Sequence, residues 1–210
     1  MIELPNVTLI AVTSVRIGET LSSFYNSMRG IKFGDCKLVT HYDNLTVPDG
    51  IKVEKCNRLP NINVWNYYVM YEMGRHIETD FCLLVHHDSF VLRPEKWEDE
   101  FLNYDYIGAP WPVRDDAYFT PKGERVRVGN GGFCIRSKRL CDAPRLHNIP
   151  FLQDRGHYNE DGNICVYNRD RFLELGMTFA PIEVAARFSQ EIQMSETEGI
   201  LPFGFHKYPK

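Results

Sequence analysis

The sequence of 210 residues lacks paired cysteines, a strongly basic segment and any long apolar run. Its six cysteines are scattered without a Cys-x-x-Cys pair, which excludes a zinc ribbon and argues against a dense disulfide framework. Lys and Arg number 24 and Asp and Glu 28, a net charge of −4, so the clustered positive surface of a nucleic-acid binder is absent. No apolar run reaches the length of a membrane span, and residues 1–12 lack the basic start of a secretion signal. We therefore expect a cytoplasmic protein that binds no nucleic acid and has no membrane span, and we expect it to be a monomer.

Apolar periodicity predicts alternating strands and helices in the first half of the chain. The expected strands are Val7–Val12, Lys37–Tyr42 and Phe81–Val85, and the expected helices between them are Gly18–Met28 and Asn61–Gly74. This βαβαβ order predicts right-handed crossovers and a mostly parallel sheet flanked by helices, so the fold class is α/β.

The second half of the chain is predicted to be richer in loops. Short helices are expected over Trp97–Tyr104 and Arg169–Leu175, an irregular region over Asp105–Arg127, and a loop entering a strand over Val128–Arg136. Since no linker interrupts the chain, we expect a single domain over residues 1–210. Residues 1–90 would form its nucleotide-binding half, and residues 91–210 the half that binds sugar and acceptor.

The segment FCLLVHHD is the most informative stretch. Its apolar run, Phe81–Val85, is typical of an interior strand and stops abruptly at His86, His87 and Asp88. Ligands of open α/β sheets bind beyond the carboxyl ends of the strands, so Asp88 stands where a metal or a phosphate is expected. The alternative is that these three residues only complete the strand end and the following turn.

Three polar groups in the second half are further candidates. Gly129-Asn130-Gly131-Gly132 lets the backbone approach a ligand because glycine has no Cβ, but it lacks the Gly-Lys-Ser/Thr of a P-loop. Glu160 and Asp161 are adjacent acids in a polar loop, and they matter only if the fold brings them to Asp88. His206 is a single histidine near the C-terminus. The alternatives are that the glycine segment is only a turn, that the two acids lie in a solvated surface loop, and that the histidine is inert.

Five short motifs occur in one order along the chain. They are Asp105–Trp111 (DYIGAPW), Val128–Ser137 (VGNGGFCIRS), Asn159–Asp161 (NED), Phe188–Glu191 (FSQE) and Phe203–His206 (FGFH). This set resembles a family of small glycosyltransferases with the GT-A nucleotide-sugar transferase fold. The resemblance spans nearly the whole chain, and it implies a central mostly parallel mixed sheet flanked by helices.

The resemblance implies a divalent metal site. GT-A enzymes hold Mn²⁺ or Mg²⁺ with an Asp-x-Asp motif, and the matching triplet here is His86-His87-Asp88. Asp88 is then the metal ligand, while His86 becomes a ribose contact or a neighbour of the ligands. His206 matches the C-terminal histidine that closes the metal site in many GT-A enzymes. Such a metal would stabilise the departing diphosphate as a Lewis acid.

The resemblance also assigns the donor site. Thr13, Ser14 and Arg16 after the first strand, and Asp43 after the second, match positions that hold uridine, so UDP is the expected carrier.

The remaining site residues are assigned on the same basis. Asn130, Gly131 and Gly132 would let the donor sugar lie against the backbone. Glu160 and Asp161 would face sugar and acceptor, with Asp161 nearest the reacting centre and Glu160 orienting hydroxyl groups.

The expected activity is metal-dependent transfer of a hexose or deoxyhexose, of glucose or rhamnose type, from a UDP-sugar to a glycan or glycoprotein acceptor. The chain also resembles the N-terminal glycosyltransferase domain of a multidomain chlorella-virus protein that helps to build capsid glycans. This resemblance implies the host cytoplasm and an N-terminal domain of a longer protein. Two alternatives stay open. A nucleotidyltransferase would share the front-half layout, although Thr13–Gly18 is poor in the glycines that such enzymes use. A non-catalytic sugar-binding module would leave the acids without a role.

Overall fold

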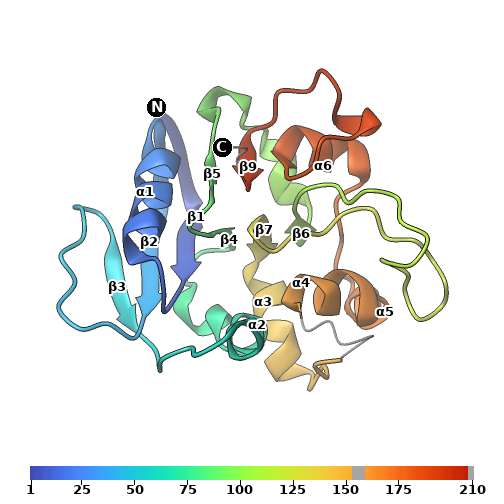
Figure 1. Cartoon of the computed structure of the whole chain (residues 1–210), viewed down its shortest axis with the longest axis horizontal. Coiled ribbons are helices and arrows are strands. Elements are labelled where there is room, and N and C mark those ends of the chain that lie inside the picture. The colour runs from blue at the N-terminus through green and yellow to red at the C-terminus, as the bar shows by residue number, and fades with distance from the viewer. Residues whose placement is uncertain (153–158, 208–210) are drawn as a thin grey trace.

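The computed structural model describes residues 1–152 and 159–207, and a six-stranded sheet forms its centre (Figure 1). The strands of this sheet span Ile2–Val12 (β1), Ile31–Thr40 (β2), Lys52–Lys55 (β3), Phe81–Val85 (β4), Tyr106–Ile107 (β6) and Phe133–Ser137 (β7). Their order is β3-β2-β1-β4-β7-β6. The first four strands are parallel and β7 is antiparallel to both of its neighbours, so the sheet is mixed and mostly parallel, as predicted.

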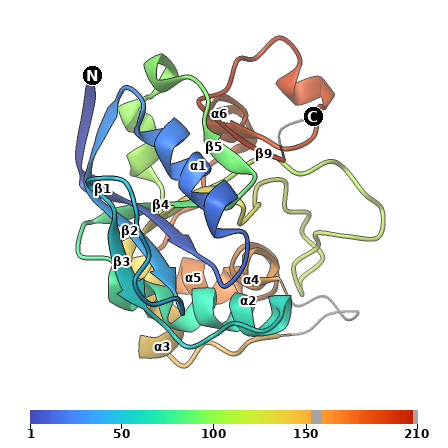
Figure 2. The ribbon, with the colours of Figure 1, turned by 60° about the vertical axis from the view of Figure 1, so that its left-hand side comes forward.

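Helices cover both faces of the sheet (Figure 2). They span Ile17–Met28 (α1), Ile62–Tyr71 (α2), Lys138–Leu146 (α3), Glu160–Gly162 (α4), Arg169–Glu174 (α5) and Ile182–Phe188 (α6). A π-helix covers Asn163–Tyr167, and 3-10 turns cover Met73–His76, Pro94–Lys96, Asp99–Asn103 and Ser195–Thr197. Side-chain caps start two of the helices: Asn61 accepts from the Val64 amide before α2, and Ser137 accepts from the Leu140 amide before α3. Among the described residues no helix is long and apolar enough to cross a membrane.

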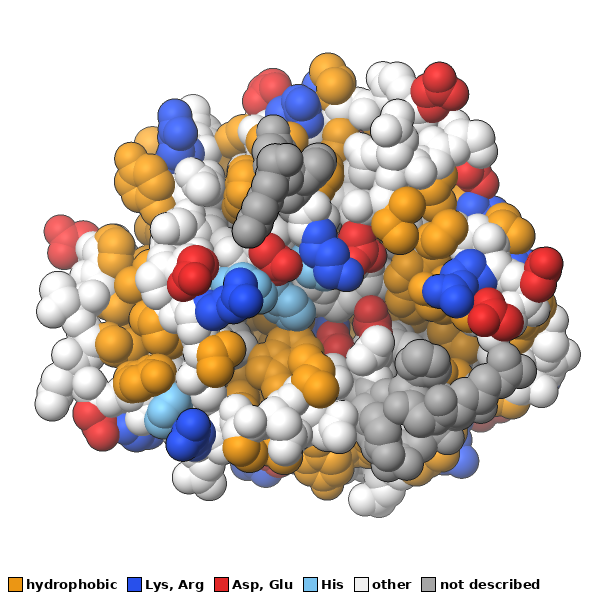
Figure 3. Space-filling view, in the orientation of Figure 1, with side chains coloured by type: hydrophobic (Ala, Val, Ile, Leu, Met, Phe, Trp, Pro, Cys, Tyr) orange, Lys and Arg blue, Asp and Glu red, His pale blue; other side chains and the backbone are white. Residues whose placement is uncertain are grey.

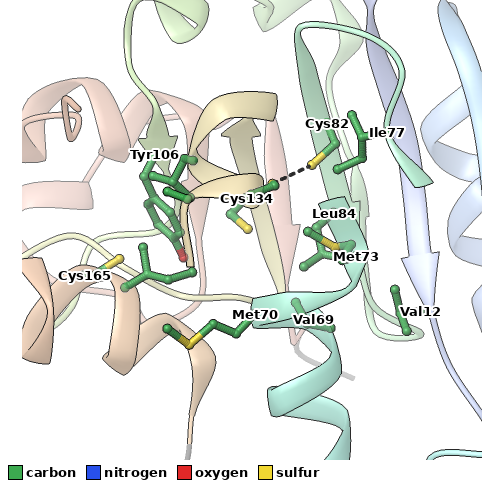
Figure 4. Close-up of a cluster of buried hydrophobic side chains, with 14 of the residues drawn as sticks. Val12, Val69, Met70, Met73, Ile77, Cys82, Leu84, Tyr106, Cys134 and Cys165 are labelled. Atoms are coloured by element: carbon green, nitrogen blue, oxygen red, sulfur yellow. Dashed lines mark hydrogen bonds between the residues drawn. The ribbon is translucent and has the colours of Figure 1, made fainter. Parts of the chain in front are cut away.

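Successive residues of the central strands point to opposite faces of the sheet, as pleating requires. Ile10 and Val12 join the apolar layer beneath α2 and α3, while Leu9 and Ala11 join the layer beneath α1 and α6. Figure 4 shows part of the first layer. The six cysteines are all buried and unpaired, so they act as small core residues rather than as disulfide partners.

A second, three-stranded sheet brings the C-terminal segment back to the end of β4. It is formed by Ser89–Val91 (β5), Ser189–Gln190 (β8) and Gly204–His206 (β9), in the order β5-β9-β8. Because β5 follows β4 after only three residues, the antiparallel pairing of β5 with β9 places the last described residues beside the carboxyl end of the central sheet.

Several predicted boundaries differ from the structure. β1 and β2 begin five and six residues before the predicted strands, because polar residues such as Lys32 and Glu3 still pair at the sheet's end. The helix predicted over Trp97–Tyr104 is only a 3-10 turn over Asp99–Asn103. The polar loop predicted around Glu160 and Asp161 is instead the start of a helical segment, since Asn66 accepts from the Glu160 amide and anchors it against α2. The part of that loop over residues 153–158 lies outside the described residues.

Candidate active site

The turn His86-His87-Asp88 follows β4 and is tied to the loop that precedes β7. The amide N–H of His86 donates to Ser89 Oγ at 2.7 Å and to the Gly132 carbonyl at 3.2 Å. Ser89 Oγ donates in turn to the Gly132 carbonyl at 2.6 Å. These bonds fix the turn at the carboxyl end of a central strand, where the sequence predicts a ligand site.

Strand β9 brings His206 to Asp88 across 118 positions of sequence. In the β5–β9 pair, Ser89 lies opposite His206, and the Lys207 amide donates to the Asp88 carbonyl at 2.9 Å. His206 Nε2 lies 3.6 Å from Asp88 Oδ1, and the rings of His86 and His206 meet edge to face at 5.6 Å. The structure therefore brings together the two residues that the resemblance assigns to a metal.

The side chains of His86, Asp88 and His206 fit a divalent cation. Their ligand atoms lie within 4.8 Å of one another. His86 Nε2 and Asp88 Oδ1 are buried and lack a hydrogen-bond partner among the described residues, a costly state that a ligand would relieve. Burial and repulsion by His206 lower the pKa of His86 to about 3, so its imidazole is neutral, the form that binds metals. Imidazole nitrogens and a carboxylate oxygen are donors that Mn²⁺ accepts.

The loop Asn130-Gly131-Gly132 packs tightly against residues of this group. A Cβ on Gly132 would lie 2.2 Å from His206 Nε2, and a Cβ on Gly131 would lie 1.9 Å from Glu160 Oε1. Asn130 has a positive φ of 69°, and its Oδ1 accepts from the Gly132 amide at 2.9 Å. Both glycines line a cavity of about 620 Å³ beside the histidine turn, but the space where a side chain would stand is taken by protein side chains.

Glu191, just after β8, contacts both the glycine loop and the C-terminal residues His206 and Lys207. Its carboxylate accepts a hydrogen bond from Asn130 Nδ2 and forms an ion pair with Lys207 Nζ. Its Oε1 also lies 3.3 Å from His206 Nδ1. Burial acts to raise the pKa of Glu191, but the interactions with His206 and Lys207 outweigh burial and lower this pKa to about 2. Glu191 is therefore ionised at neutral pH.

Glu160 is held in a buried ion pair. Its Oε1 lies 2.6 Å from Arg136 Nη2, and the side chains are 4% and 1% exposed. Arg136 lies on β7, and its guanidinium also faces the ring of Tyr106 at 5.4 Å. Removing either charge of such a pair leaves the other buried without compensation.

Asp161 is oriented by backbone amides. Its Oδ2 accepts from the Gly131 amide at 3.0 Å and its Oδ1 from the Gly162 amide at 2.7 Å. Burial and the charge of Glu160 raise its pKa to about 6, against the opposing effect of these amides and of Arg136. A carboxylate with a pKa near neutrality can accept a proton efficiently at physiological pH.

Two adjoining cavities meet at the histidine turn. The larger, of about 620 Å³, is lined by Asp88, Asp161 and Glu191 among others. The smaller, of about 280 Å³, is lined mostly by residues from the end of β1, the start of α2 and the end of β4. Trp65 and His86 line both cavities. In Figure 3 histidine side chains lie at the middle of this face, with acidic and basic side chains beside them.

The residues predicted to hold uridine are divided by the structure. Thr13 and Ser14 line the smaller cavity, although Ser14 Oγ accepts from the Leu59 amide and Thr13 Oγ1 donates to the Val15 carbonyl. Arg16 precedes α1 with a φ of 51°, and Asp43 pairs with Lys55 on the surface. Arg16 and Asp43 do not line either cavity. Thr40 ends β2, so Asp43 lies three residues beyond the strand rather than directly at its end.

Sequence reasoning missed three residues of the site. Glu191 is the last residue of the FSQE motif, but the sequence of that motif does not indicate what Glu191 does. Lys207 directly follows His206 and lines the cleft. Trp65 donates from Nε1 to the Val12 carbonyl at 2.7 Å, and its ring meets His86 edge to face at 4.8 Å. The only signal for Trp65 was an aromatic residue near the start of a helix.

Comparison with known proteins agrees with this architecture. An active-site mutant of LgtC, a glycosyltransferase of the GT-A fold, superposes with a TM-score of 0.54 at 12% identity, over 97% of this chain and 88% of that chain. The central sheet with its flanking helices is therefore a GT-A fold, as expected. No curated protein sequence matches the chain. The family described as "Protein of unknown function (DUF5672)" matches residues 55–206, which include the histidine turn, the glycine loop, Glu191 and His206, so the chain belongs to this family.

Proposed function

We propose that this protein is a metal-dependent glycosyltransferase that transfers a hexose or deoxyhexose, of glucose or rhamnose type, from a UDP-sugar to a glycan or glycoprotein acceptor. The observation that carries the proposal is the group of His86, Asp88 and His206, which lies beyond a central strand where two cavities adjoin. The GT-A fold supports it, since LgtC is a glycosyltransferase.

Asp88, His206 and His86 would hold the divalent cation. Their two nitrogen donors favour Mn²⁺ over Mg²⁺, which prefers oxygen ligands. When bound, this cation would supply Lewis-acid stabilisation of the negative charge on the leaving diphosphate. The unpartnered atoms of His86 and Asp88 support the assignment.

The smaller cavity would take the uridine and the larger one the sugar and the acceptor. The smaller cavity is lined by Val12, Val15, Leu59 and the Trp65 ring, which suits the faces of a planar base and a ribose. His86 borders both cavities, so a diphosphate joining base and sugar would pass the metal group.

Asp161 would act on the sugar, with Glu160 beside it. Two backbone amides orient the Asp161 carboxylate in the larger cavity, and its pKa of about 6 suits proton acceptance from an acceptor hydroxyl. Glu160 is fixed by Arg136 and adds negative charge near the position of the oxocarbenium-like sugar. The viral capsid glycan and the cytoplasmic location stay predictions.

A thermal-shift series tests the proposal. UDP should raise the melting temperature with Mn²⁺ and far less with EDTA, because only a cation links the diphosphate to the histidine turn. The matched control is Asp49→Asn, which changes an exposed carboxylate that lines neither cavity and should respond as the wild type does.

Product analysis separates the alternatives. With Mn²⁺ and a UDP-sugar, release of UDP by transfer or slow hydrolysis supports a glycosyltransferase. Release of pyrophosphate from a nucleoside triphosphate and a sugar phosphate would instead identify a nucleotidyltransferase. A sugar-binding module would respond to neither nucleotide nor metal, and that result would contradict the proposal.

A further inference from the structure

Glu191 lies directly behind the histidine of the candidate metal group. It follows β8, and its side chain is 12% exposed. Its Oε1 lies 3.3 Å from His206 Nδ1, within ion-pair range, and this buried nitrogen has no hydrogen-bond partner among the described residues. Neither the resemblance nor the comparisons assign a role to this carboxylate.

The imidazole of His206 is fixed from three sides. Its backbone is held by the pairing of β9 with β5, opposite Ser89. Its ring lies against Gly132, where a Cβ would approach Nε2 to 2.2 Å. One ring nitrogen then faces Glu191, and the other, Nε2, lies 3.6 Å from Asp88 Oδ1.

The chemistry of these groups dictates one tautomer. A neutral imidazole has one nitrogen that donates and one that accepts, whereas a carboxylate can only accept. Both ring nitrogens of His206 face a carboxylate, Nδ1 that of Glu191 and Nε2 that of Asp88. A cation shared with Asp88 needs the lone pair of Nε2, so the hydrogen then stands on Nδ1, toward Glu191. Histidines that bind metals commonly donate their second N–H to a carboxylate, which fixes ring orientation and raises the basicity of the ligand.

The Glu191 carboxylate is also hydrogen-bonded to the glycine loop, residues 129–132. Glu191 accepts from Asn130 Nδ2, while Asn130 Oδ1 accepts from the Gly132 amide at 2.9 Å. Because Gly132 supports the His206 ring, Glu191 fixes both the ring and the surface beneath it.

We propose that Glu191 is a positioning residue that holds His206 as the Nδ1–H tautomer, with Nε2 free to bind a divalent cation together with Asp88. This inference rests on the proposed function, since it deepens the assignment of the metal site. It does not require Glu191 to touch the donor or the acceptor.

Binding of Mn²⁺ alone, followed by electron paramagnetic resonance of the free ion, is the first test. Glu191→Gln should weaken Mn²⁺ binding about 10–100-fold, as is usual for loss of such a partner. Glu196→Gln should leave it unchanged, since Glu196 pairs with Arg127 and lines neither cavity. If Asp88→Ala abolishes binding while Glu191→Gln does not weaken it, the role of Glu191 is overturned and the metal site stands.

The second test needs neither metal nor activity. Nitrogen-15 NMR of the metal-free wild type, recorded at a pH high enough for the ring to be singly protonated, should show His206 protonated at Nδ1, and Glu191→Gln should shift the population toward Nε2–H. Nε2–H as the main form in the wild type would overturn the inference. If the wild type binds no Mn²⁺ yet keeps Nδ1–H, the positioning by Glu191 is supported while the metal dependence in the proposed function is contradicted.

Discussion

At the scale of single residues, the adjacent acids Glu160 and Asp161 differ in the groups that surround their carboxylates. Glu160 neutralises Arg136 in the core, so its charge stabilises the fold. Among the described residues, the Asp161 carboxylate accepts hydrogen bonds from backbone amides alone; it is buried and lies beside the charge of Glu160, so its ionised form is disfavoured. Such stored electrostatic cost is typical of functional carboxylates.

Glu160→Gln and Asp161→Asn should therefore shift stability in opposite directions at pH 8. Glu160→Gln leaves Arg136 buried without its counter-charge, which should cost about 3 kcal/mol and lower the melting temperature by roughly 6–12 °C. Asp161→Asn removes a disfavoured charge and should raise the melting temperature. Thermal denaturation followed by circular dichroism measures both, and equal losses in the two variants would contradict the contrast.

The gain from Asp161→Asn should depend on pH. The pKa of Asp161 is raised from 3.8 to about 6 in the folded protein, which therefore binds the proton more tightly than the unfolded chain. This contribution to stability is fully present below pH 3.8 and is lost as pH rises through 6. Asp161→Asn should thus gain little at pH 4 and most above pH 7. A gain that is constant with pH would show that another cause stabilises the variant.

Asp161→Asn should also lower turnover, by roughly 10²–10⁴-fold, with little change in the affinity for the donor. Wild-type turnover should rise with pH through about 6, as the carboxylate loses its proton. Steady-state rates of transfer, or of donor hydrolysis, between pH 5 and 8 provide the measurement. Near-wild-type turnover in Asp161→Asn would place the chemistry elsewhere.

At the scale of elements, the site depends on two strands of three residues each. β4 could be predicted from its apolar run, but β5 and β9 are too short for a periodic signal. Their pairing joins positions 89 and 206, and nothing local specifies such a contact. The metal role of His206 came only from the resemblance, whereas that of Asp88 also followed from its place after a strand.

Gly132→Ala tests this junction. The added methyl group would stand 2.2 Å from His206 Nε2, so β9 must shift and His206 must leave Asp88. We expect a stability loss of about 1–3 kcal/mol, with loss of Mn²⁺-dependent UDP binding. Gly18→Ala is the matched control, because nothing lies within 4 Å of its Cβ position in α1, and it should be neutral or slightly stabilising. Retained UDP binding in Gly132→Ala would contradict the packing argument.

At the scale of the whole molecule, the two halves of the chain meet at the histidine turn. The strand order of the first half and the mixed, mostly parallel sheet could be predicted, because buried parallel strands give continuous apolar runs. The helices α3 and α6 and the role of Glu191 could not, since these depend on contacts between distant segments. Arg16 and Asp43 lie three or four residues beyond the observed ends of β1 and β2 and line neither cavity, and the sequence pattern does not reveal this.

Nucleotide selectivity depends on residues from several distant segments of the molecule. UDP should bind more tightly than CMP or GDP in the presence of Mn²⁺, because a wrong base leaves buried polar groups unpaired at about 1–3 kcal/mol each. Asp43→Asn should leave the affinity for UDP unchanged, since Asp43 lies outside both cavities. Competition calorimetry decides both points. Equal affinity for GDP and UDP would refute the selectivity, and a loss of UDP affinity in Asp43→Asn would restore the base contact that the resemblance implies.

The central claim is that Asp88 and His206 hold a divalent cation against the diphosphate of the donor. Calorimetric titration of UDP with and without Mn²⁺ tests it in the wild type, Asp88→Ala, His206→Ala and the control His147→Ala, which changes an exposed histidine outside both cavities. We predict that Mn²⁺ strengthens UDP binding in the wild type and in the control, that Asp88→Ala abolishes this effect, and that His206→Ala weakens it less. Unchanged Mn²⁺-dependent affinity in Asp88→Ala would contradict the account.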